Sequence, residues 1–183
     1  MDKSISQIES RAESRAGILI EIENNSVKET SLGVLTAAAG HEIYALVMSD
    51  DISALTDRLA EFGADHIVGI KGLEDEKTSP DFMAQILVAA IKEYRLEALL
   101  ATASAMGKDL LARIAAIIDE PLISDCIEVD IEEKKVLKSH FSGKTFASLK
   151  VTGPMLLCTV RPNAIEPSPA AAPAAGQIIQ FES

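Results

Sequence analysis

Short apolar segments alternate with amphipathic segments along the first two thirds of the chain. The apolar segments have the length and composition of strands and cover residues 16–23 (AGILIEIE), 41–49, 65–70 and 97–102. Each is followed by a segment in which apolar residues recur every three or four positions, as they do on one face of a helix. These segments are 26–40, 50–63, 79–94 and 108–119. Four strand–helix cycles predict parallel βαβ units with right-handed crossovers.

Local signals place the ends of these helices. Ser26 and Glu29 have the spacing of a capping box, which predicts a helix start at residue 26. Ser79 followed by Pro80 predicts another start, because proline suits the first helical position. Gly33 lies inside the first predicted helix at an intrinsic cost of about 1 kcal/mol, which indicates close contact with a neighbour.

The pattern changes after Pro121. Four segments without helical periodicity follow, at 122–131, 134–142, 144–151 and 155–162, and we expect them to be strands joined by turns. The predicted fold is therefore α/β and three-layered. It has a mainly parallel sheet, helices on both faces, and antiparallel strands at the C-terminal edge of the sheet. The SGKT sequence at 142–145 lacks the first glycine of a phosphate-binding loop, so we interpret it as a turn between two strands.

The same pattern divides the chain into three parts. Residues 1–15 form a polar leader, residues 16–165 form the α/β domain, and residues 166–183 form a Pro/Ala-rich linker and a short apolar tail. The leader lacks the apolar stretch of a signal peptide, and no run of 18 apolar residues occurs. We expect a soluble, cytoplasmic protein.

Charge and cysteine usage exclude several functional classes. The net charge of −11 argues against binding to nucleic acid or to an anionic membrane, because polyanions would be repelled. Cys126 and Cys158 lie within apolar strand-like segments and lack metal-ligand spacing. We interpret them as buried thiols in a reducing compartment. The three histidines are scattered, so we assign no metal site and no catalytic residue.

The segment between the fourth strand and the fourth helix contains the strongest candidate for a binding site. Thr102, Ser104, Gly107 and Lys108 could hold a phosphate through hydroxyl groups, an ammonium group and backbone N–H groups at a helix N-terminus. The other interpretation is that small residues let the helix pack tightly, with Ser104 as its N-cap. No Walker or GxGxxG spacing is present.

Several segments resemble the N-terminal domain of the electron-transfer flavoprotein alpha subunit. They are ILIEIE near the start, GADHIVGI, LLATASAMGKDLLARIAAIID, PLISDCIEVD and TVRPNA, in this order between residues 17 and 165. The resemblance implies the adenine nucleotide alpha hydrolase-like fold. It also implies an electron-carrier component rather than an enzyme.

In that family the alpha subunit forms a heterodimer with a beta subunit that holds AMP. The complex takes electrons from flavin dehydrogenases and passes them to a quinone oxidoreductase or another acceptor. FAD binds to a second domain of the alpha subunit, after a linker. Because only eight residues follow the Pro/Ala stretch here, we expect no FAD on this chain, which is a fragment or a naturally short protein.

The resemblance therefore predicts an assembly domain that docks the beta subunit and self-associates when it is alone. The alternative is a stand-alone adenine-nucleotide-binding module that uses residues 102–108. A small hydrolytic enzyme is disfavoured, because no nucleophile, base and orienting group can be assembled from the sequence.

Overall fold

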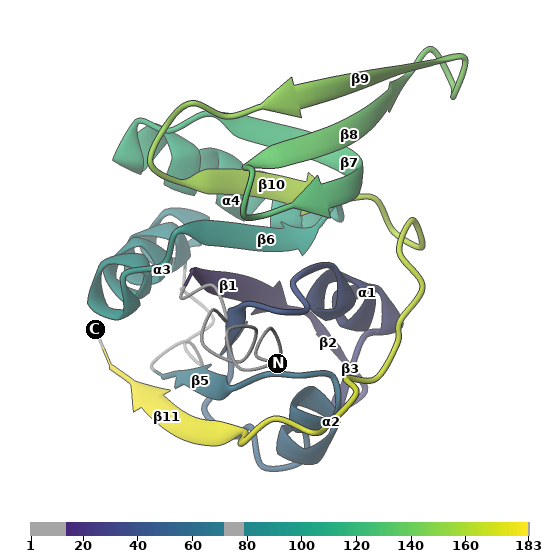
Figure 1. Cartoon of the computed structure of the whole chain (residues 1–183). Helices are drawn as coiled ribbons and strands as arrows, with labels where there is room; N and C mark the ends of the chain where they lie inside the picture. The colour runs from purple at the N-terminus through teal and green to yellow at the C-terminus, as the bar shows by residue number, and fades with distance from the viewer. Residues whose placement is uncertain (1–13, 72–78, 183) are drawn as a thin grey trace, which may run out of the picture.

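The structure is a computed structural model that describes residues 14–71 and 79–182 (Figure 1). Residues 1–13 of the predicted leader lie outside the described residues. The main sheet has nine strands in the order β11-β5-β4-β1-β6-β10-β7-β8-β9. Its strands are β1 (Arg15–Ile20), β4 (Glu42–Val47), β5 (His66–Ile70), β6 (Ala98–Thr102), β7 (Leu122–Asp130), β8 (Lys135–His140), β9 (Thr145–Lys150), β10 (Leu156–Val160) and β11 (Gln177–Phe181). The helices are α1 (Glu29–Ala37), α2 (Thr56–Glu61), α3 (Pro80–Tyr94) and α4 (Ala105–Ile118).

Two apolar layers cover the two faces of this sheet. Side chains of α1 and α2 pack on one face, among them Leu35 and Leu59. Side chains of α3 and α4 pack on the other face, among them Leu87 and Leu111. The strands between these layers are buried on both sides, which explains their continuous runs of apolar residues. The predicted α/β class, with a mainly parallel sheet and helices on both faces, is confirmed.

The starts of three helices differ from the prediction. Helix α2 begins at Thr56 rather than near residue 50, and no side chain caps it. Asn24 and Asn25 both have positive φ and close a small hairpin between β2 (Ile22–Glu23) and β3 (Ser26–Val27). The predicted capping box is therefore wrong, because Ser26 pairs with Glu23 and α1 begins at Glu29, three residues later, without a side-chain cap. Helix α4 begins at Ala105, three residues earlier than predicted, because Ser104 caps it.

The C-terminal strands show one further difference. Strands β7, β8 and β9 are antiparallel and form one edge of the sheet, as predicted. Strand β10 does not join them at that edge. It lies between β6 and β7 and is parallel to both, because its apolar residues 156–158 are buried from both faces. The long excursion through β8 and β9 allows the chain to return to the centre of the sheet.

The Pro/Ala-rich segment is packed against the body of the domain. The backbone N–H groups of Ala170 and Ala174 donate to carbonyls of α2, at 3.0 Å each. The chain then enters β11, which pairs in parallel with β5 at the edge opposite β9 (Figure 1). Linker composition gave no indication of this strand, whose Ile179 and Phe181 also pack against the core.

Gly33 has the close contact that its sequence context predicted. A Cβ atom at this position would lie 2.5 Å from the carbonyl oxygen of Ile165, which follows β10. The glycine therefore lets the segment after β10 cross α1 at very short range.

Candidate functional site

The candidate site lies where the direction of the strand order reverses. After β1 the chain places β4 and β5 on one side of β1, and then β6 on the other side. The connections that leave the carboxyl ends of β1 and β6 therefore run toward opposite edges of the sheet. Open parallel sheets bind ligands preferentially at such a point. Glu21 follows β1, and Ser104 follows β6 just before α4.

Ser104 and Glu21 close this position with the chain's own groups. The hydroxyl of Ser104 donates to Glu21 Oε1 and accepts a hydrogen bond from the backbone N–H of Gly107 at 3.0 Å. Glu21 is only 5% exposed, and its other carboxylate oxygen accepts from Lys28 Nζ at 3.1 Å. The backbone N–H of Glu21 donates to Ser31 Oγ at 3.0 Å. These contacts connect β1, α1 and the start of α4.

Gly107 brings α4 against the end of β6. A Cβ at Gly107 would lie 2.0 Å from the carbonyl oxygen of Thr102. The Thr102 hydroxyl is buried and has no hydrogen-bond partner within residues 14–71 and 79–182. Lys108 is exposed, and its ammonium group contributes to lowering the pKa of Asp125. The structure thus places the four predicted residues between the end of β6 and the first turn of α4. Ser104 accepts from the N–H of Gly107 through its hydroxyl and from the N–H of Lys108 through its carbonyl, whereas the Thr102 hydroxyl joins neither.

The chemistry of this arrangement does not suit a phosphate. A phosphate at the N-terminus of α4 would take the place where Ser104 already caps the helix, beside the Glu21 carboxylate. Burial of two anions next to each other is strongly unfavourable. The residues present therefore do not fit the pyrophosphate of a flavin or the phosphate of AMP. They favour the interpretation of the loop as a packed junction.

Sequence reasoning missed Glu21. Its signal was an acidic residue at the end of an apolar strand, three residues before Asn24. A buried carboxylate at such a place requires a partner. The two partners come from residue 28 and residue 104, and only the folded chain brings them together.

A second ion pair lies at the carboxyl end of β10. Arg161 donates to both carboxylate oxygens of Asp125, at 3.2 and 2.6 Å. The hydrogen bonds from Arg161 lower the pKa of Asp125, and they outweigh the opposing effect of burial. Asp125 has a φ of +66°, which bends β7 so that this carboxylate reaches the arginine. The pair holds the end of β10 against β7.

The two cysteines lie on the neighbouring strands β7 and β10. Both are free and fully buried, as predicted. The hydrogen bond between their side chains lowers the pKa of Cys126, and with burial it raises that of Cys158 well above the usual value.

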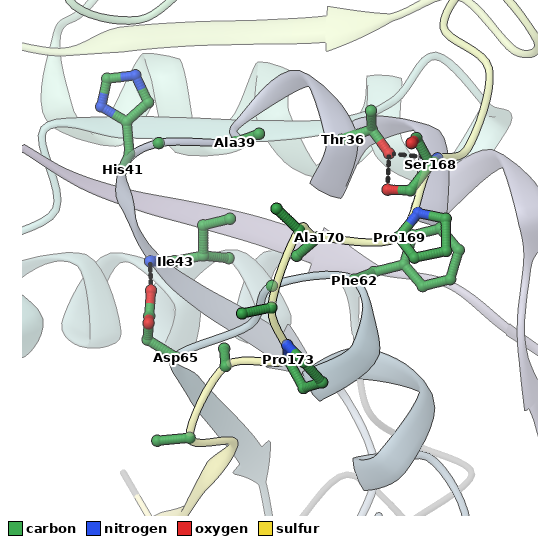
Figure 2. Close-up of a pocket in the computed structure, with 16 residues that line it drawn as sticks. Thr36, Ala39, His41, Ile43, Phe62, Asp65, Ser168, Pro169, Ala170 and Pro173 are labelled. Carbon is green, nitrogen blue, oxygen red and sulfur yellow. Dashed lines mark hydrogen bonds between the residues drawn. The ribbon is translucent and has the colours of Figure 1, made fainter.

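A cavity of about 600 Å³ lies beneath the Pro/Ala-rich segment, at the amino ends of β4 and β5. Pro169, Ala170 and Pro173 of this segment line it together with Phe62, which directly follows α2 (Figure 2). Its polar groups are largely engaged within the chain. The Thr36 hydroxyl accepts from the N–H of Ser168 at 3.0 Å, and Asp65 Oδ2 accepts from the N–H of Ile43 at 2.9 Å (Figure 2). Small apolar side chains form much of the cavity wall. Among the residues described, no set of free polar groups points toward a common centre in it.

A network of polar and aromatic groups also occupies the amino end of the sheet. Glu42 accepts from Arg15 Nε at 2.9 Å and from the Tyr44 hydroxyl at 3.1 Å, and it lies 2.9 Å from His66 Nε2. Burial opposes ionisation of Glu42, but these hydrogen bonds outweigh it and lower its pKa. The Tyr44 ring stacks on His66 and on Tyr94. The network ties β1, β4, β5 and α3 together. No grouping of His, Cys, Asp and Glu suited to a metal ion occurs in the described ranges.

Comparison with known proteins identifies the family. A family model described as the electron transfer flavoprotein domain matches residues 16–183. The chain belongs to the electron transfer flavoprotein family. The predicted resemblance to the alpha subunit is also confirmed, since relatives that bear this name align with most of the chain.

The relatives show how large a share of a longer protein this chain resembles. The chain is 26% identical to electron transfer flavoprotein subunit alpha of Bacillus subtilis, over 82% of the chain and 48% of that protein. It is 26% identical to the same subunit of Thermoanaerobacterium thermosaccharolyticum, over 94% of the chain and 53% of that protein. It is also 25% identical to the acryloyl-CoA reductase electron transfer subunit beta of Anaerotignum propionicum, over 78% and 38%. The chain spans about half the length of the alpha subunits that it matches.

A membrane span needs a long, apolar helix. None of the helices in the described part of the chain has the length and apolar character that crossing a bilayer requires.

Proposed function

We propose that this chain is the assembly domain of an electron transfer flavoprotein of the alpha type. In this function it docks the beta subunit and supports electron transfer from flavin dehydrogenases to an acceptor. The observation that carries the proposal is the match of residues 16–183 to the electron transfer flavoprotein domain, together with alignment to about half of each alpha subunit. The function is that of an electron-carrier component, and we assign no catalytic residue to this chain.

The geometry of the candidate site supports an architectural function. The end of β6 and the start of α4 are held by Ser104, Glu21 and Lys28, and the Ser104 hydroxyl and the Gly107 N–H, which could hold a phosphate, are used in these contacts. A domain that does not bind the redox cofactor contributes by holding the parts that do. FAD on another domain and AMP on the beta subunit fit this division of roles.

The alternative function, a stand-alone adenine-nucleotide-binding module, has less support. It needs a phosphate at residues 102–108, where the Glu21 carboxylate is buried. The negative charge of a buried carboxylate disfavours binding of a phosphate beside it. Isothermal titration calorimetry of the chain with AMP separates the two functions, and we expect no saturable heat at micromolar nucleotide. Saturable binding that is lost in Gly107→Val would support the module instead.

The experiment that tests the main proposal is co-expression with the beta subunit of an electron transfer flavoprotein from the same genome. We expect the two chains to elute together in size-exclusion chromatography at a one-to-one ratio. Beta subunit that elutes alone, from a mixture in which both chains are folded by circular dichroism, would refute the proposal.

A further inference from the structure

The strands β8 and β9 form a projecting ribbon that the rest of the domain does not cover. We name residues 134–150 the β8–β9 arm. Figure 1 shows the arm at the edge of the sheet, beyond β7 and away from the helices. Val136 at its base is the one buried residue within it, and most of β9 is exposed on both faces. The arm therefore contributes little to the core.

The arm carries unusual apolar exposure for a region outside the core. Seven large hydrophobic side chains are exposed in the described part of the chain, and three of them belong to the arm. Phe141 is 79% exposed, Phe146 is 61% exposed and Leu149 is 38% exposed. Exposed aromatic side chains are typical of surfaces that bind protein.

The charge of the arm is opposite to that of the rest of the molecule. It contains five lysines and no acidic residue. The remainder of the chain contains 12 basic and 28 acidic residues. Two of the lysines serve the fold, since Lys150 pairs with Glu133 and Lys134 donates to the carbonyls of Gly153 and Pro154. The other three, Lys135, Lys138 and Lys144, take part in none of the ion pairs among the described residues.

Protection of an exposed edge strand explains only part of this pattern. Lysines on an edge strand prevent uncontrolled strand pairing. That explanation accounts for charge on β9 but not for the exposed rings of Phe141 and Phe146, which would promote association. A surface that combines cationic groups with aromatic ones fits a specific partner, and the charges then exclude wrong partners and speed encounter.

We propose that the β8–β9 arm is the docking surface of this domain for a partner protein that presents carboxylates around an apolar patch. The inference rests on the proposed function, in which that partner is the beta subunit. Charge complementarity favours an acidic protein over a nucleic acid, because the remainder of the chain would repel a polyanion. The lysines supply the outer contacts, and Phe146 supplies the apolar centre on the face of the ribbon that it shares with Leu137 and Lys135.

The test compares matched substitutions on the arm and elsewhere. Lys144→Glu on the arm is matched by Lys92→Glu on α3, and Phe146→Ser is matched by Ile117→Ser on α4. All four positions are exposed, so the substitutions leave the core intact. Binding of each full chain to the beta subunit from the same genome is measured by calorimetry at low and high salt. Circular dichroism checks the fold of each variant.

We expect each arm variant to weaken binding by about tenfold or more, the scale of an interface anchor, while the matched controls stay near the wild type. Lys144→Glu should also reduce the salt dependence of binding. Wild-type affinity in both arm variants would overturn the inference and leave the proposed function standing. No binding by the wild-type chain would overturn both. Arm-dependent self-association without partner binding, or arm-dependent binding of a single-stranded oligonucleotide, would also overturn the inference.

Discussion

Replacement of Gly107 by alanine tests whether the junction between β6 and α4 is fixed by packing. The added Cβ would lie 2.0 Å from the Thr102 carbonyl oxygen and 3.3 Å from the Ala101 Cβ. The first contact is with backbone, so α4 must move by about 1 Å to relieve it. Such a movement also strains the hydrogen bonds of Ser104 to Gly107 and to Glu21.

Two opposing effects set the magnitude. Helix propensity alone would make alanine more stable than glycine by about 1 kcal/mol. Overpacking against a backbone costs about 1–3 kcal/mol, and loss of the N-cap costs about 1 kcal/mol more. The clash and the lost cap outweigh the propensity, so we expect Gly107→Ala to lower the free energy of unfolding by about 2 kcal/mol. The corresponding fall in melting temperature is roughly 4–8 °C for a domain of this size.

Urea unfolding followed by circular dichroism at 222 nm measures this effect, because the chain has no tryptophan. Ala112→Gly, at an exposed position in the middle of the same helix, is the matched control and should lose about 1 kcal/mol through propensity alone. An unchanged or higher urea midpoint for Gly107→Ala, with the same m-value, would show that the contact with Thr102 does not constrain the junction.

Three further predictions follow from other contacts. Ser104→Ala should lower the free energy of unfolding by about 1 kcal/mol in urea unfolding, because it removes the N-cap of α4, and an unchanged midpoint would contradict that role. Arg161→Met should cost about 1 kcal/mol near pH 7, the scale of a partly exposed ion pair. The pKa of Asp125 lies below its usual 3.8 in the folded chain, so this difference should be full above about pH 4 and shrink as the pH falls through the folded value. A difference constant from pH 3 to pH 7 would argue against the pair. Gly33→Ala should destabilise the chain although alanine favours helices, because its Cβ would meet the Ile165 carbonyl, and a raised melting temperature would refute the contact.

Amphipathic periodicity and turn residues determined much of this fold. The alternation of apolar and amphipathic segments predicted β1, β4, β5 and β6 and the helices between them, because burial on both faces of a parallel sheet demands continuous apolar runs. The start of α3 at Pro80 followed from Ser79, whose side chain accepts from the N–H of Phe82 as a local cap. Such features depend on residues a few positions apart, so the sequence alone contains them.

Features that depend on distant residues required the tertiary structure. The sequence of β10 is that of any buried strand, and only the competition among long-range pairings decides that it lies between β6 and β7. Strand β11 pairs with β5, and its Ile179 and Phe181 pack against the core, contacts with residues more than 80 positions away that composition does not encode. The burial of the Glu21 carboxylate is explained only by its hydrogen bonds with Lys28 and Ser104, which the fold brings together. Local order follows from neighbours in the chain, whereas strand order and buried charge depend on the free energy of the whole fold.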